Sequence, residues 1–161
     1  MMGKIICFHN PEEENGYLSN WYLSKFVYAD QQFSSMEQYM MYRKAICFHD
    51  EKVTSKILQT DDVAEIKALG RRVSGYDDNV WNGFRQIIVY EGLLNKFSQN
   101  EDLKEKLLAT GNAILAEAAV KDKIWGIGLA MNDPDCLDRA KWKGQNLLGY
   151  ALMMARSKLN R

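Results

Sequence analysis

The chain has 161 residues, of which 47% are hydrophobic and 26% are charged. This length and composition are typical of one globular domain with a sizeable core, so we predict a single domain over residues 1–161. The 21 basic and 21 acidic side chains balance, which argues against a protein that coats nucleic acid through broad phosphate neutralisation. A local patch that recognises one phosphorylated ligand is still compatible with this balance.

Three cysteines, Cys7, Cys47 and Cys136, form no CxxC pair. Their odd number and their spacing indicate reduced thiols in a cytoplasmic protein. Only His9 and His49 could join them as soft ligands, which argues against a zinc site. The acids soon after the first short apolar run do not fit a secretory signal, and no apolar run approaches the ~18 residues of a membrane span.

The first thirty-odd residues predict strands and turns. Residues 4–9, KIICFH, form a short β-rich run, and residues 21–33 alternate aromatic and polar side chains around a turn at Ala29 and Asp30. From Ser34 the pattern changes to helix, and the S-x-x-E sequence from Ser34 to Glu37 is a capping-box signature.

Capping residues and apolar spacing predict the remaining elements. We expect helices from Asp50 to about Gln59, from Asp61 to near Gly70, from Asp77 or Asp78 to about Phe97, from Asn100 to Gly111, and from Asn146 through Leu159. Residues 113–120, AILAEAAV, suit a buried strand or a short helix, and residues 122–146 are mostly loop. The expected fold is α+β, predominantly helical, a single compact domain with a small antiparallel sheet near the N-terminus.

The first long helix carries two charges on an apolar surface. Glu37 and Lys44 project about 20° apart and lie ~10.5 Å apart along the axis, and Met40 and Met41 flank them. A helix that is apolar nearly all round is buried, and buried charges need partners or a water-lined cleft. Either a ligand lies between the two groups, or Glu37 completes the capping box while Lys44 reaches water.

Several other polar segments have both a structural and a functional interpretation. Glu117 lies in the middle of AILAEAAV, where a salt bridge to an arginine would explain it. Asp122 falls in a turn, where aspartates usually bond their own backbone. Residues 125–128, WGIG, offer an indole and glycines that permit close backbone approach, while Trp81 also suits plain core packing.

Two further segments suit anionic groups. Arg71 follows a helix-ending glycine, and arginine forks suit phosphates. Glycines bracket Asn146 at a helix N-terminus, where free backbone N–H groups favour an anion or a polar ligand edge. This GQNLLG segment lacks the order of a dinucleotide fold and the lysine of a P-loop.

The order of the segments along the chain is more specific than any one of them. The chain contains in succession SNWY, FSSMEQY, RKA, LGRRV, NVW, NKF, LLATG, LAE, DKIWGIG and GQNLLGYALMMAR. This succession resembles the NADAR family, also called YbiA-like, over about Ile6 to Arg156. The most specific parts are the glutamate after the F-x-S segment, the E-x4-D-x2-WG block and the closing G-x-N-x-LG helix.

The resemblance implies an N-glycosidase that cleaves the bond between ribose C1′ and an exocyclic aryl amine, with a phosphate on the sugar's 5′ side. Two substrate types are associated with the family: guanine in nucleic acid that carries ADP-ribose on its exocyclic amine, and early riboflavin-biosynthesis intermediates, which are ribosylamino-pyrimidine phosphates. We favour the first because the chain is free-standing rather than fused to a riboflavin enzyme. Whether an ADP-ribosyltransferase is its functional partner is open.

The resemblance also implies roles for individual residues. Glu37 is expected to act as general acid/base, and Asp122 to orient the ribose or activate water. Lys44 is expected either to form a Schiff base at C1′ or to hold the phosphate. Trp81 or Trp125 would stack the base. The residues expected to bind substrate are Ser19, Asn20, Trp21, Arg71, Trp81, Glu117, Trp125, Gly126, Asn146 and Gly149. The chemistry requires no metal and no redox cofactor.

Three positions depart from the family's pattern. Gln38 stands where a histidine is frequent, Met41 where a glutamine is frequent, and Gln145 where a lysine is frequent. These changes bear on substrate choice more than on reaction type. An alternative of another class is a non-catalytic module that binds ADP-ribose or a nucleotide, which would not need Glu37. A helical interaction domain explains the interior polar groups less well.

Overall fold

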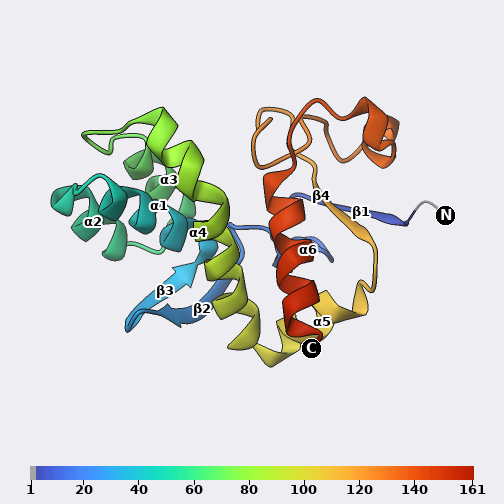
Figure 1. The fold of residues 1–161 in the computed structure, drawn as a ribbon, viewed down its shortest axis with the longest axis horizontal. Coiled ribbons are helices and arrows are strands. Elements are labelled where there is room, and N and C mark those ends of the chain that lie inside the picture. The colour runs from blue at the N-terminus through green and yellow to red at the C-terminus, as the bar shows by residue number, and fades with distance from the viewer. Residues whose placement is uncertain (1–2) are drawn as a thin grey trace. The chain divides into compact units, whose positions relative to one another are not determined.

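The computed structural model describes residues 3–161, which contain six α-helices and four short strands. The predicted α+β, predominantly helical fold class is confirmed. The chain forms two compact units, one from its two ends, up to Tyr22 and from Glu101, and one from residues 23–100 (Figure 1). Whether the whole chain acts as the predicted single domain stays a prediction. Within residues 3–161, no helix combines the length and apolar character needed to cross a bilayer.

The unit of residues 23–100 begins with the predicted hairpin. Strand β2 (Leu23–Tyr28) pairs antiparallel with β3 (Gln31–Ser35). The two turn residues, Ala29 and Asp30, have φ of 49° and 66°. Such a left-handed pair matches the twist of adjacent antiparallel strands, so it supports a two-residue hairpin loop. The predicted antiparallel sheet is confirmed in this hairpin.

Four helices complete this unit, namely α1 (Met36–Cys47), α2 (Glu51–Leu58), α3 (Val63–Gly70) and α4 (Asp78–Ser98). Asp50 and Asp77 cap α2 and α4 as predicted, but α3 is capped by Asp62 rather than Asp61. Helix α1 contacts the other three helices and β3, which makes it the centre of the unit.

Tyr39 fixes α1 within this core. Its ring packs edge-on against Phe33, with ring centroids 5.4 Å apart, and its hydroxyl donates to the carbonyl of Ile88 on α4 at 2.7 Å. Gly92 permits this approach, since a Cβ there would lie 2.3 Å from the Tyr39 ring. The apolar surface predicted for this helix is therefore buried against the hairpin and α4.

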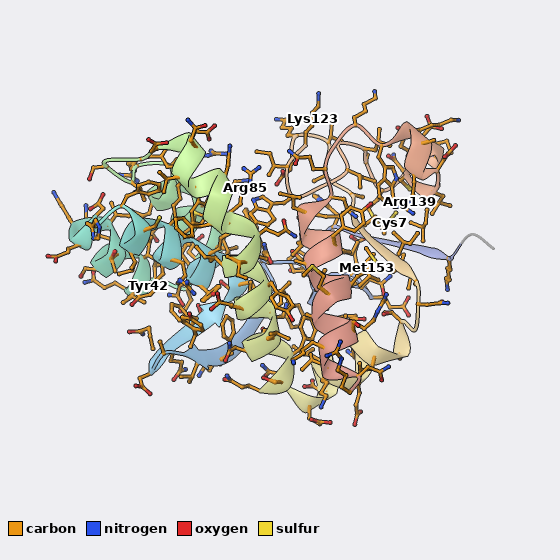
Figure 2. The ribbon with its side chains drawn as sticks, viewed as in Figure 1. Cys7, Tyr42, Arg85, Lys123, Arg139 and Met153 are labelled. Atoms are coloured by element: carbon orange, nitrogen blue, oxygen red, sulfur yellow. The ribbon has the colours of Figure 1, made fainter. Side chains whose placement is uncertain are left out.

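The unit of the two chain ends is built on a parallel strand pair. Strand β1 (Ile5–Phe8), which carries Cys7 (Figure 2), pairs with β4 (Ile114–Glu117). Residues 113–120 therefore contain a strand, which settles the ambiguity in the sequence. Strand β1 lies in this second sheet rather than beside the hairpin, a long-range pairing that no local pattern indicates.

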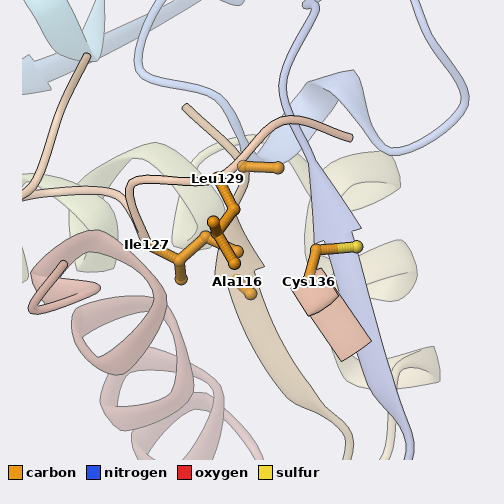
Figure 3. Close-up of a cluster of buried hydrophobic side chains, with 5 residues drawn as sticks. Ala116, Ile127, Leu129 and Cys136 are labelled. Atoms are coloured by element: carbon orange, nitrogen blue, oxygen red, sulfur yellow. The ribbon is translucent and has the colours of Figure 1, made fainter. Parts of the chain in front are cut away.

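Helices and loops cover this strand pair. Helix α6 (Leu147–Leu159) packs on β4, and α5 (Glu101–Ala109) contacts α6. Three short 3-10 helices lie in the connections: η1 (Gly16–Leu18), η2 (Pro134–Leu137) and η3 (Arg139–Lys141). A small core of Ala116, Ala118, Ile127, Leu129 and Cys136 joins the strand to the loop (Figure 3).

The three thiols are free, as predicted. The Cys7 thiol donates to the carbonyl of Cys136 at 3.7 Å. Burial raises the pKa of Cys7 to about 12, and its interaction with Cys136 adds to the increase. Because the thiolate is the reactive form, Cys7 is an unreactive packing residue at neutral pH.

Candidate active site

The start of α1 determines what Glu37 does. Strand β3 continues to Ser35, so the helix begins one residue later than the sequence pattern indicated. Ser35, not Ser34, is the N-cap, and its hydroxyl accepts from the backbone N–H of Gln38 at 3.1 Å. The side-chain oxygen of Gln38 reaches back to the backbone N–H of Ser34 at 2.7 Å. The predicted capping box from Ser34 to Glu37 is therefore wrong, because Ser35 is the N-cap and the Gln38 side chain bonds the N–H of Ser34, one residue before it.

Gln38 also ties α1 to its neighbour. Its side-chain nitrogen donates to the carbonyls of Ile57 at 3.0 Å and Thr60 at 2.9 Å, at the end of α2. Gln38 stands where a histidine is frequent in the family. Its side-chain amide joins the start of α1 to the end of α2. Ser35 and Gln38 therefore carry out the capping, and Glu37 is not the residue that completes it.

Glu37, Lys44 and Arg71 form one electrostatic cluster. Glu37 is only 5% exposed in the first turn of α1, where the helix dipole favours a carboxylate. Burial lowers the pKa of Lys44, the Glu37 carboxylate opposes that shift, and Arg71 adds to it. The structure therefore brings together three of the residues predicted from the sequence, and it places them all in the unit of residues 23–100.

Lys44 packs on an aromatic ring. Its ammonium lies 4.6 Å from the centroid of Tyr76, whose ring in turn contacts Phe48 with centroids 5.3 Å apart. Tyr76 was not predicted, because it lies in an irregular connection where hydrophobic periodicity gives no signal. Trp81, in the first turn of α4, is only 5% exposed and packs as a core residue, so its predicted stacking role stays a prediction.

Asp122 organises the loop that precedes Trp125. Its Oδ1 accepts from the backbone N–H groups of Ile124 at 3.0 Å and Trp125 at 2.8 Å. This is the ordinary behaviour of a turn aspartate, which the sequence also allowed. Its predicted role at the ribose stays a prediction, and Oδ1 is already used in the turn.

The Asn146 side chain hydrogen-bonds to the edge of β4 that does not pair with β1. It is fully buried with φ of 53°. Its side-chain nitrogen donates to the carbonyl of Leu115 at 2.9 Å, and its side-chain oxygen accepts from the N–H of Glu117 at 3.1 Å. The side-chain amide therefore pairs with β4 as a neighbouring strand would. The Asn146 side chain thus joins the start of α6 to β4 beside Glu117, and its predicted role in substrate binding stays a prediction.

The first backbone N–H groups of α6 form hydrogen bonds within the protein. The backbone N–H groups of Asn146, Leu147 and Leu148 donate to carbonyls of the loop at Gly126, Ile124 and Trp125, at 3.0, 3.1 and 3.2 Å. The prediction that these groups are free to bind an anion is therefore wrong. The cause is the WGIG loop, which folds against the helix start and satisfies its donors.

The predicted glycines of this region permit close packing. A Cβ at Gly149 would lie 2.0 Å from the carbonyl oxygen of Leu115, and one at Gly126 would lie 2.9 Å from the carbonyl oxygens of Asp122 and Glu117. These distances are shorter than real contacts. Both glycines therefore let α6 and the WGIG loop approach β4.

We expect Gly149→Ala to lower the free energy of unfolding by about 1–3 kcal/mol, because overpacking forces the helix away from β4. Urea denaturation followed by circular dichroism measures this. Gly83→Ala is the matched control, since a Cβ at that exposed helical position meets nothing within 4 Å. The control should gain about 0.8–1 kcal/mol from helix propensity, and equal effects of the two changes would contradict the packing argument.

The segment from Ser19 to Trp21 contains a buried acceptor. The Ser19 hydroxyl accepts from the backbone N–H of Trp21 at 3.1 Å. Asn20 is 6% exposed, and its buried side-chain oxygen has no hydrogen-bond partner among residues 3–161. A buried polar atom without a partner costs free energy, so it suits a position that a ligand completes. The predicted binding role of these residues stays a prediction.

Taken together, a mostly helical α+β fold with a buried carboxylate beside two cations suits acid–base chemistry on a phosphorylated ligand. Residues 7–160 match the family described as NADAR domain. The chain therefore belongs to the NADAR family, as the resemblance indicated.

Individual relatives match along most of this chain. N-glycosidase R617 of Acanthamoeba polyphaga mimivirus is 38% identical over 161 residues, covering 95% of each chain. Riboflavin biosynthesis protein VVA0006 of Vibrio vulnificus is 31% identical, covering 99% of this chain and 40% of the relative. The NMR structure of the E. coli protein YbiA has a TM-score of 0.81 at 28% identity, covering 99% of this chain and 87% of that chain.

Proposed function

We propose that this protein is an N-glycosidase that hydrolyses the bond between ribose C1′ and an exocyclic aryl amine. The observation that carries the proposal is Glu37, a buried carboxylate in the first turn of α1 that acts electrostatically on Lys44, as Arg71 does. Relatives named N-glycosidase, among them R617, support the reaction class.

Glu37 supplies the proton that this reaction needs. In hydrolysis the C1′–N bond breaks while a C1′–O bond forms to water. Protonated Glu37 gives its proton to the departing amine, and the resulting carboxylate takes one from the attacking water, which restores the acid.

Lys44 has two candidate roles, which the sequence also left open. Its lowered pKa favours the neutral amine, which can attack C1′ of the ring-opened glycosylamine. The aryl amine then leaves, and water hydrolyses the resulting Schiff base. In the second role the ammonium holds the phosphate of the substrate beside Arg71.

For the substrate, our first candidate is guanine in nucleic acid that carries ADP-ribose on its exocyclic amine. A balanced net charge is compatible with this substrate, because recognition of one flipped base needs few contacts. The second candidate is a ribosylamino-pyrimidine phosphate, and the name of the Vibrio vulnificus relative favours it.

Two parallel incubations test the function. The protein is given an oligonucleotide with ADP-ribosylated guanine and, separately, a ribosylamino-pyrimidine phosphate, and products are identified by mass spectrometry. Release of ADP-ribose or of ribose 5-phosphate supports the corresponding substrate. If neither glycosidic bond is cleaved, the proposed activity is wrong and the binding module becomes the better reading.

We expect sodium borohydride added during turnover to trap a covalent adduct on the wild-type protein and none on Lys44→Ala. The reason is that reduction makes a Schiff base permanent, and intact-mass measurement followed by peptide mapping locates it. Lys52→Ala, at an exposed position of α2, is the control and should retain the adduct. If wild type gives no adduct and Lys44→Ala still turns over, the covalent role of Lys44 is wrong.

A further inference from the structure

Tyr76, in the connection before α4, interacts with two cations, Lys44 and Arg85. The Lys44 ammonium lies over the Tyr76 ring at 4.6 Å, and the Tyr76 hydroxyl donates to Asp78 at 2.8 Å. Asp78 begins α4, and Arg85 follows it by seven residues, which is two turns on the same helix face. Tyr76 is thus held between the Lys44 side chain and the face of α4 that carries Arg85.

Arg85 is an unexplained cation of this face. It is partly buried on the first half of α4 (Figure 2), one turn beyond Trp81. Its buried Nε has no hydrogen-bond partner among residues 3–161. An unsatisfied buried donor on a charged group destabilises the fold, so it is expected where a ligand supplies the missing acceptor.

Lys44, Arg71 and Arg85 form no close ion pair with an acidic side chain among residues 3–161, although Glu37 acts on Lys44 electrostatically. Within the described residues, the ion pairs join Arg43 to Glu91 and Lys141 to Asp135, and neither includes Lys44, Arg71 or Arg85. Arg71 lowers the pKa of Lys44, after the larger effect of burial. Burial and the bond to Asp78 raise the pKa of Tyr76, whereas Arg85 lowers it. Each arginine therefore lies within electrostatic range of the Lys44–Tyr76 pair.

We propose that Arg85 and Arg71, each within electrostatic range of the Lys44–Tyr76 pair, form a phosphate-binding site, and that this site holds the 5′ phosphate group of the ribosyl substrate. Tyr76 keeps Lys44 in place by its ring. Arg85 supplies a planar fork for phosphate oxygens, and its unpaired Nε–H gains an acceptor when the phosphate binds. The inference rests on the proposed function, because it assigns the ligand of the same site.

Direct binding measures this role separately from turnover. Isothermal titration calorimetry with ADP-ribose and with ribose 5-phosphate should show binding that Arg85→Met weakens by about 10- to 100-fold, the loss of one charge-assisted contact. Unphosphorylated ribose should bind equally to both proteins. The probe that binds wild type more tightly indicates whether a diphosphate or a monophosphate is the natural group.

Two further variants keep the test decisive. Arg72→Met removes a cation from the neighbouring position and should change affinity less than about 2-fold, because Arg71 and not Arg72 acts on Lys44. Arg85→Lys, which keeps the charge but loses the fork, should lie between wild type and Arg85→Met. Thermal melting by circular dichroism shows that each variant is folded.

The outcomes separate this inference from the proposed function. If wild type cleaves its substrate but Arg85→Met binds ADP-ribose and ribose 5-phosphate as wild type does, the phosphate site is wrong and the glycosidase stands. If wild type binds the phosphorylated probes through Arg85 but cleaves neither substrate, the phosphate site stands and the glycosidase is wrong.

Discussion

Glu37→Gln should reduce turnover on the ribosylated amine by about 10²–10⁴-fold, the usual effect of losing a general acid, while binding of the substrate is retained. Glutamine has nearly the same shape as glutamate, but it cannot deliver a proton to the departing amine. Because Ser35 and Gln38 cap α1, the substitution should leave the helix start intact. Single-turnover kinetics and calorimetry on the same protein measure the two effects.

Glu91→Gln is the matched control for this experiment. Glu91 is partly buried, whereas Glu37 is buried, and it belongs to the same unit, where it accepts from Tyr28 at 2.9 Å and lies 3.8 Å from Arg43. Its substitution should alter stability and leave turnover nearly unchanged. If Glu37→Gln turns over substrate at the wild-type rate, the carboxylate has no catalytic role and a non-catalytic binding module explains the site better.

Lys96→Met should remove a strong pH dependence of stability. Lys96 is fully buried on α4, with its ammonium 5.0 Å from the centroid of the Phe97 ring, and burial lowers its pKa from 10.5 to about 7. Between these two values the folded protein holds Lys96 neutral, whereas the unfolded chain holds it protonated. Unfolding therefore takes up a proton, and the contribution of Lys96 to stability increases as pH rises through this window.

The expected slope is about 1.4 kcal/mol per pH unit in the difference between wild type and Lys96→Met. Below pH about 7 both states are protonated, so the difference should become constant. Urea denaturation across this range measures it. Lys52→Met, at an exposed position of α2, should show no such slope relative to wild type. A flat difference for Lys96→Met would mean that the buried amine stays charged in the folded protein.

Turn and capping residues in the sequence predict most of the secondary structure. They do so because a turn or a helix end depends on only a few neighbouring residues. The turn at Ala29 and Asp30 and the caps at Asp50 and Asp77 are of this kind. The pairing of β1 with β4 joins distant segments, and no local pattern specifies which strands meet. For the same reason the sequence left residues 113–120 undecided between strand and helix.

The site shows where a local pattern becomes ambiguous. Two serines in succession, Ser34 and Ser35, are followed by Glu37 and Gln38, so two capping boxes are compatible with the sequence. The end of β3 makes Ser35 the N-cap, and this changes the interpretation of Glu37. Tyr76 and Arg85 gave no signal, because their importance arises from contacts between separate elements.

The side-chain amide of Asn146 has a consequence for association between molecules. It satisfies the carbonyl of Leu115 and the N–H of Glu117, which a strand from another copy would otherwise use to extend the sheet. Exposed strand edges are templates for intermolecular pairing and aggregation. The Asn146 side chain and the N–H of Ile127, which donates to the Glu117 carbonyl at 2.9 Å, thus occupy groups on this edge of β4 that intermolecular strand pairing would need.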